Sequence, residues 1–142
     1  MYADTLFAAE RLHLVRLLSW GAISVVAGTI LLLLTTSARL RPQLLRSFGV
    51  QCTAWGALEL ALGGAAFATL HMRDLSGASR LERLGWMQLG LYIGVAGCGI
   101  VVALVGWRAA RSLRTTGAGM GIFLQGIALL VIELAFVAQI SR

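Results

Sequence analysis

Four apolar stretches, each long enough to cross a membrane, constrain this chain more than any other feature of its sequence. A helix needs about 20 apolar residues to span the hydrocarbon layer of a bilayer, and the four runs are separated by short connections rich in arginine. Inside lipid, backbone N–H and C=O groups must pair within their own segment, and the runs show no alternating strand pattern. We therefore predict an all-α integral membrane protein, a single four-helix bundle with transmembrane helices at about residues 17–36, 48–70, 85–107 and 118–140.

The composition supports a lipid environment. The chain is 58% hydrophobic and 13% charged, with a mean hydropathy of +0.84, which leaves too little polar surface for an ordinary water-soluble domain. All twelve basic residues are arginines. In a soluble domain, so high a positive charge would suggest that the protein binds nucleic acid. Here the arginines lie between apolar runs, where they would meet lipid headgroups. We expect a lipid partner and no nucleic acid.

Two connections carry arginine and no acidic residue, and their charge bears on the topology. With an even number of spans they share one side, while both termini and the longer connection at 71–84 share the other. The arginine count is equal on the two sides, so we favour the compact arginine-only connections as cytoplasmic and the termini as periplasmic, in a bacterial inner membrane. The expected headgroup or interface residues are Arg39, Arg41, Arg46, Arg108, Arg111 and Arg114.

The stretch 1–16 mixes apolar and charged residues, which predicts an amphipathic lead-in that lies at the interface or prolongs the first helix. Arg11 and Arg16 before an apolar run, followed by Thr36-Ser37-Ala38, also fit a cleavable signal peptide, although the run is long for a signal core.

An internal repeat relates the second and fourth apolar runs. Shifted by 74 residues, FGVQCTAWGALELAL aligns with IFLQGIALLVIELAF, and Gln51 and Glu59 then meet Gln125 and Glu133. The repeated unit would be a helical hairpin, with the two copies related by an axis along the membrane normal. Chance similarity between runs of biased composition is the alternative.

Polar residues within the predicted spans are the first candidate site. An ionised carboxylate near the bilayer centre is costly, so Glu59 and Glu133 need a partner or a proton. Gln51 and Gln125, two turns earlier, could supply amide partners. The four residues form either a proton or cation relay, or only hydrogen bonds that hold helices together.

Glycine spacing predicts close helix packing. Gly49, Gly56 and Gly63 recur every seven residues, and Gly90 and Gly94 form a small-xxx-small pair. Such residues let helix backbones approach each other within a bundle or against a partner.

His13 and His71 fall on the same predicted membrane face and could ligate a haem, a chlorophyll-type pigment or a metal, although interfacial histidines are more often solvated. Cys52 and Cys98 lack zinc or redox spacing. We find no phosphate loop, nucleophile elbow, zinc-protease helix or dinucleotide fingerprint, and we predict neither an enzyme nor any other cofactor.

The segments LLSWGAISVVAG and FGVQCTAWGALELALGGAAF resemble small uncharacterised bacterial four-helix integral membrane proteins, grouped as a domain of unknown function. The resemblance covers about half of the chain. Phe48, Gln51 and Trp55 match the family pattern, whereas Glu59 stands where that pattern has an amide. The resemblance implies a fold and no known activity.

The leading hypothesis is a non-enzymatic membrane subunit that packs through glycine-rich helices in a larger bacterial complex or a homo-oligomer. One alternative is a small proton- or ion-coupled transporter that uses Glu59 and Glu133. Another is a haem- or pigment-associated subunit of an electron-transfer or photosynthetic complex.

Overall fold

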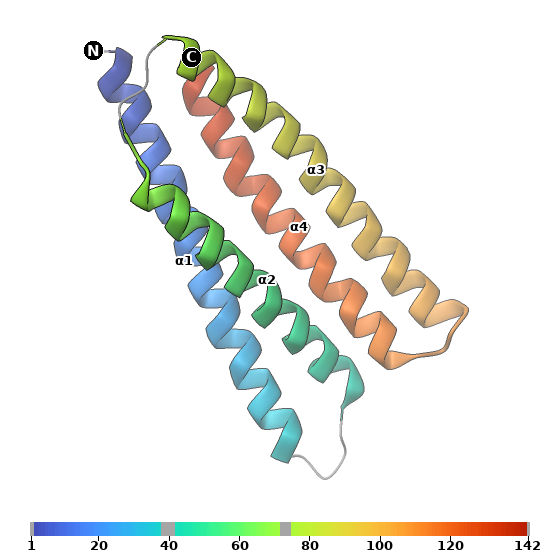
Figure 1. Cartoon of the computed structure of the whole chain (residues 1–142). Helices are drawn as coiled ribbons and strands as arrows, with labels where there is room; N and C mark the ends of the chain where they lie inside the picture. Colours follow the sequence, from blue (N-terminus) through green and yellow to red (C-terminus); the bar gives the residue numbers. More distant parts are fainter. Residues whose placement is uncertain (1, 38–41, 72–74, 142) are drawn as a thin grey trace.

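The computed structural model describes residues 2–37, 42–71 and 75–141, and within these ranges it contains four helices and no strand (Figure 1). The all-α, four-helix prediction is confirmed. The helices run up and down the bundle in turn, so the two ends of the chain lie at the same end of it (Figure 1). They are α1 (Tyr2–Ser37), α2 (Gln43–Ala68), α3 (Leu75–Arg108) and α4 (Leu113–Ile140).

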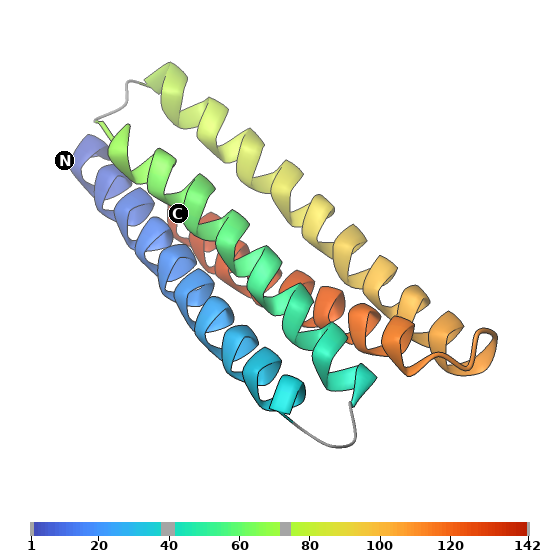
Figure 2. The ribbon, with the colours of Figure 1, turned by 60° about the horizontal axis from the view of Figure 1, so that its bottom comes forward.

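The bundle is built from two antiparallel hairpins, α1 with α2 and α3 with α4. Helix α4 joins them, because it packs extensively against α2 and to a smaller extent against α1. Helix α3 makes extensive contact with α4 alone among the described helices. It therefore stands at the edge of the bundle, as two views show (Figures 1 and 2).

Burial is inverted relative to a water-soluble protein. The largest fully buried side chains are those of Gln125 and Glu133, whereas large apolar side chains point outward, including Leu33 at 65% exposure and Val101 at 60%. An apolar exterior of this extent fits lipid as the surrounding medium. Within the described residues, three helices are long and apolar enough to cross a membrane, over Asp4–Thr36, Ser79–Arg108 and Leu113–Ile140. These helices indicate a membrane protein.

Helix α2 is not among these three. Gln51, Glu59 and several glycines lower its hydropathy. Its outward face is nevertheless apolar, because Leu58 and Leu62 are about half exposed or more. Glu59, one of the polar residues that lower its hydropathy, is buried.

One helix boundary decides between two predicted alternatives, and another differs from the sequence prediction. Helix α1 is continuous from Tyr2, so the lead-in prolongs the first helix. The predicted connection at 71–84 is mostly helix, because α3 already begins at Leu75. Arginine, leucine and glutamate have high helix propensity, so the charges of this segment mark where the apolar run ends and do not interrupt the helix.

Candidate functional site

Gln125 forms the centre of a polar network between α1 and α4. Its side chain is fully buried. Trp20 Nε1 donates a hydrogen bond of 2.7 Å to Gln125 Oε1, and Gln125 Nε2 donates one of 3.2 Å to Ser24 Oγ. Trp20 and Ser24 are four residues apart and therefore share one face of α1. The amide thus finds partners for both of its polar atoms on a single neighbouring helix.

Glu133 lies two turns further along α4 and is 1% exposed. Its Oε2 is 3.6 Å from His13 Nε2 on α1. Its Oε1 has no hydrogen-bond partner among the described residues. The His13 ring also packs on Phe136, with ring centroids 4.4 Å apart. Glu133 therefore lies beside His13, and one of its oxygens is unpaired.

Glu59 brings a second buried carboxyl from α2. It is 5% exposed, and within the described parts of the chain neither of its oxygens has a hydrogen-bond partner. Its Cβ lies close to Gly21 of α1. Arg16, on the same helix as Gly21, has one buried guanidinium nitrogen that is also unpaired. Three helices thus place unpaired polar atoms inside the half of the bundle that holds the chain termini.

The expected pairing of glutamine amides with glutamates is not what the structure shows for Gln125, which bonds to Trp20 and Ser24. Gln51 is half-buried and lies against Gly121 of α4, at the opposite end of the bundle from Glu133. Trp20 and Ser24 were not predicted from the sequence as partners of Gln125. Their spacing on one face of the first helix was visible, but nothing in the sequence showed that this face meets α4.

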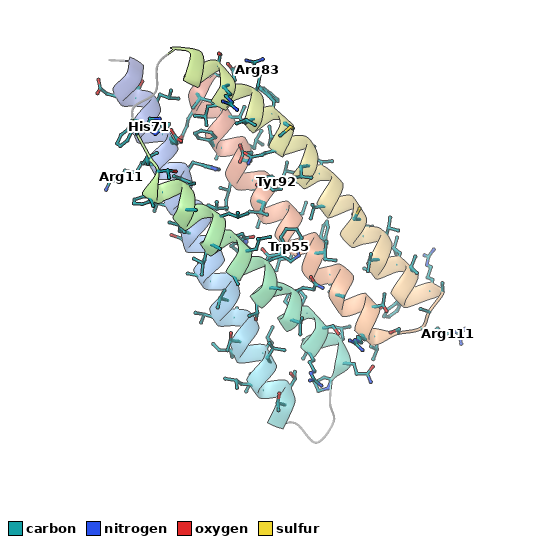
Figure 3. The ribbon with its side chains drawn as sticks, viewed as in Figure 1. Arg11, Trp55, His71, Arg83, Tyr92 and Arg111 are labelled. Atoms are coloured by element: carbon teal, nitrogen blue, oxygen red, sulfur yellow. The ribbon has the colours of Figure 1, made fainter. Side chains whose placement is uncertain are left out.

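The two histidines lie in different surroundings. His13 is half-buried against α4, whereas His71 is exposed just after α2, with its Nδ1 2.8 Å from the Thr69 carbonyl oxygen. Figure 3 shows His71 and Arg83 at the end of the bundle that holds the termini and Arg111 at the other end. No group of three or more His, Cys, Asp or Glu side chains among the described residues is arranged to hold a metal ion. Haem, pigment or metal ligation by the histidines stays a prediction.

Glycines of α1 and α2 face each other along the first hairpin. A Cβ on Gly56 would lie 2.6 Å from the Gly21 carbonyl oxygen, and a Cβ on Gly49 would lie 3.0 Å from that of Gly28. Gly63 packs against Leu17 and Leu18. The three glycines spaced by seven on α2 therefore let the two backbones come into contact, as helix association in membranes requires.

Helix α3 presents glycines on two opposite faces. Gly85, Gly99 and Gly106 pack against α4, where a Cβ on Gly106 would lie 2.5 Å from the Thr116 backbone nitrogen. Gly90 and Gly94, which the sequence analysis singled out, have open space around them, and so does Gly97. The inner set was not predicted from the sequence, although its spacing in multiples of seven residues could have revealed it.

Four arginines of the two acid-free connections are among the described residues, and they lie near one end of the bundle. Arg46 is in the first turn of α2 and Arg114 in the first turn of α4, and both line a cleft between these helices. Arg108 and Arg111 are exposed at the end of α3 and in the short connection to α4. Arg39 and Arg41 lie outside the described residues.

The sequence model of a protein family of unknown function matches residues 16–134. The chain belongs to that family, DUF6992. The DUF6992 match begins at Arg16 in α1 and ends at Leu134 in α4, so it takes in part of every helix. It includes Trp20, Gln125, Glu59 and Glu133, whereas His13 lies before it. No curated protein and no solved structure matches the chain.

Proposed function

We propose that this protein is a small non-enzymatic subunit of a membrane complex, located in a bacterial inner membrane that its four helices span. It assembles with a second copy or another membrane subunit through the outer face of α3. We define this outer face by Gly90, Gly94 and Gly97. The observation that carries the proposal is the open space around these glycines, whereas Gly99 and Gly106 on the opposite face of the same helix lie against the α4 backbone.

Glycine in membrane helices acts through packing. A helix surface that meets only lipid gains nothing from glycine, whereas glycine at an interface lets a second backbone approach closely. In this chain Gly21, Gly56 and Gly99 each lie against another helix. The outer face of α3 carries the same residue type at helical spacing beside exposed Leu91 and Val101, which supports a partner helix there.

The proposal includes α2 as the fourth span. Its 26 residues correspond to about 39 Å of helix, longer than the hydrocarbon layer of about 30 Å. Glu59 is buried, whereas Leu58 and Leu62 point outward. This arrangement supports a spanning helix whose polar residues face the inside of the bundle and whose apolar residues face lipid.

Cys98 gives a direct test, because it is exposed on the flank of the outer face, whereas the other cysteine, Cys52, is buried. Mild oxidation of native membranes should give a disulfide-linked dimer that is absent in Cys98→Ser if two α3 helices pair. Gly94→Leu should reduce this dimer, or the co-purification of another subunit. Gly64→Leu is the matched control, since Gly64 on α2 also has open space around it.

A monomer that forms no Cys98 disulfide, retains no partner in mild detergent and behaves identically with and without Gly94→Leu would contradict assembly through α3.

A second candidate function is proton coupling, and the unpaired buried oxygens of Glu59 and Glu133 favour it. A carboxyl group enclosed without a counter-ion can take up and release a proton, and such groups in membrane interiors often mark proton paths. His13, 3.6 Å from Glu133, adds a second group that can exchange a proton.

Purified protein in liposomes tests this candidate through the decay of an internal pH dye under an imposed membrane potential. Proton coupling predicts a flux that falls in Glu59→Gln and Glu133→Gln and persists in Glu82→Gln. Glu82 is the control because it is an exposed acid on α3. Equal flux in all four proteins, or none above empty liposomes, would remove this candidate.

A further inference from the structure

A cleft of about 740 Å³ opens between the first turns of α2 and α4, at the end of the bundle away from the chain termini. Figures 1 and 2 both show these two helix starts side by side. Apart from Val50 and Ala118, the side chains that line the cleft are polar or basic: Gln43, Arg46, Ser47 and Gln51 from α2, and Ser112, Arg114 and Thr115 at the start of α4.

The charge in the cleft is of one sign. Each wall contributes one arginine, and neither Arg46 nor Arg114 makes an ion pair with a residue that the structure describes. Among the described residues that line the cleft, none is acidic. Guanidinium groups bind phosphate through a planar fork of N–H donors, and hydroxyl groups such as those of Ser47 and Thr115 add further donors.

The backbone adds to this charge. Both helices point their N-termini at the cleft, and the N-terminus of a helix carries partial positive charge on unpaired N–H groups. The N-cap of α2 is Pro42, which provides no side-chain cap. At α4 the Ser112 hydroxyl accepts from the Thr115 N–H. The first turn of α2 thus reaches the cleft with backbone donors that no capping side chain occupies.

In a bilayer that the apolar helices span, this end of the bundle would lie near the lipid headgroups. Arg114 is the second residue of α4, and the apolar span follows it directly. Leu45 and Leu113, beside the two arginines in sequence, are about half exposed. Apolar surface thus adjoins the basic cleft, which matches a molecule with a phosphate at one end and an acyl chain at the other.

We propose that this cleft binds a phosphate group, that of a membrane phospholipid, between Arg46 of α2 and Arg114 of α4. The site is independent of assembly through α3, because it lies between α2 and α4 and uses none of the outer-face residues.

The test compares two double variants of equal charge. Arg46→Gln with Arg114→Gln removes both cleft arginines, whereas Arg108→Gln with Arg111→Gln removes two exposed arginines near the same end that do not line the cleft. Native mass spectrometry of the protein titrated with phosphatidylglycerol measures lipid affinity, and diacylglycerol, which has no phosphate, is the lipid control. The cleft variant should bind phosphatidylglycerol about tenfold more weakly, while the control variant stays within about twofold of the wild type.

Inorganic phosphate separates the two sources of the group. If it raises the melting temperature of the wild type but not of the cleft variant, and phosphatidylglycerol does not bind, the site takes phosphate from water and the membrane source is wrong. Equal losses in the two double variants would show attraction by surface charge alone and overturn the proposal. A wild type that responds to neither probe, or binds diacylglycerol equally well, would overturn it too. Equal melting temperatures of the variants without ligand exclude misfolding as the cause.

Discussion

The indole nitrogen of Trp20 donates a 2.7 Å hydrogen bond to the side-chain oxygen of Gln125, and this bond crosses from one helical hairpin to the other. The two residues are 105 positions apart in the chain. Contact between α1 and α4 is smaller than the contact within each hairpin. The bond therefore adds a directed polar link between the hairpins beside the packing of α2 on α4.

Removal of either partner should weaken the joint between the hairpins. Trp20→Phe keeps an aromatic ring but removes the donor, and Gln125→Leu removes the acceptor together with the bond to Ser24. A double-mutant cycle, measured by reversible unfolding in mixed micelles, should give a coupling energy of about 0.6–1.7 kcal/mol. Additive effects of the two substitutions would mean that the bond contributes nothing in the folded protein.

A methyl group at Gly56 should separate α1 from α2. The added Cβ would lie 2.6 Å from the Gly21 carbonyl oxygen and 2.9 Å from the Val25 backbone nitrogen, and backbone atoms cannot move aside cheaply. We expect Gly56→Ala to cost roughly 1–3 kcal/mol of unfolding free energy. Gly64→Ala is the control, because open space surrounds Gly64 and alanine has the higher helix propensity by up to about 1 kcal/mol. Thermal unfolding in one detergent should rank the proteins Gly64→Ala, wild type, Gly56→Ala from most to least stable.

At the interface between α3 and α4, some glycines lie against backbone atoms and others against side chains, so alanine substitutions there should differ in their cost. A Cβ on Gly126 would lie 2.6 Å from the Ala96 backbone nitrogen, whereas a Cβ on Gly85 would meet the ends of the Val137 and Glu133 side chains. Side-chain ends can rotate away, so Gly85→Ala should lower the melting temperature less than Gly126→Ala does. Equal losses would show that the interior around Glu133 is as rigid as the helix backbone contact.

The sequence predicted those parts of the fold that each helix determines by itself. Four apolar runs gave the four helices, and the glycines spaced by seven in α2 do face α1. Charged residues were a poorer guide to helix ends. Arg80, Glu82 and Arg83 suggested a connection, but they are helical, because a helix continues past the apolar layer wherever its residues favour that conformation.

Relationships between helices could not be read from the sequence. Gln125 and Glu133 were expected to be buried polar residues, and they are the largest fully buried side chains in the described chain. Their neighbours depend on which face of α1 meets α4, and the spacing of residues within one helix does not determine that. Helix α3 shows the same limit, because it carries small residues on two faces and only packing reveals that Gly85 and Gly99 lie inside while Gly90 and Gly94 lie outside.

The position of α2 in the membrane can be tested at its two ends. Thr36 lies near the end of α1, before the connection to α2, and His71 lies just after α2, and both are exposed. In a background without native cysteines, Cys52→Ala with Cys98→Ala, single cysteines are introduced as Thr36→Cys and His71→Cys. If α2 spans the membrane, a charged maleimide that cannot cross it labels only one of the two in intact cells, because about 39 Å of helix then separates them across the bilayer.

The favoured orientation makes His71→Cys the labelled variant and Thr36→Cys the one that reacts only after permeabilisation. The reverse pattern would keep four spans and invert the orientation. Labelling of both from one side would mean that α2 does not cross, and that its lower hydropathy reflects a helix lying at the surface.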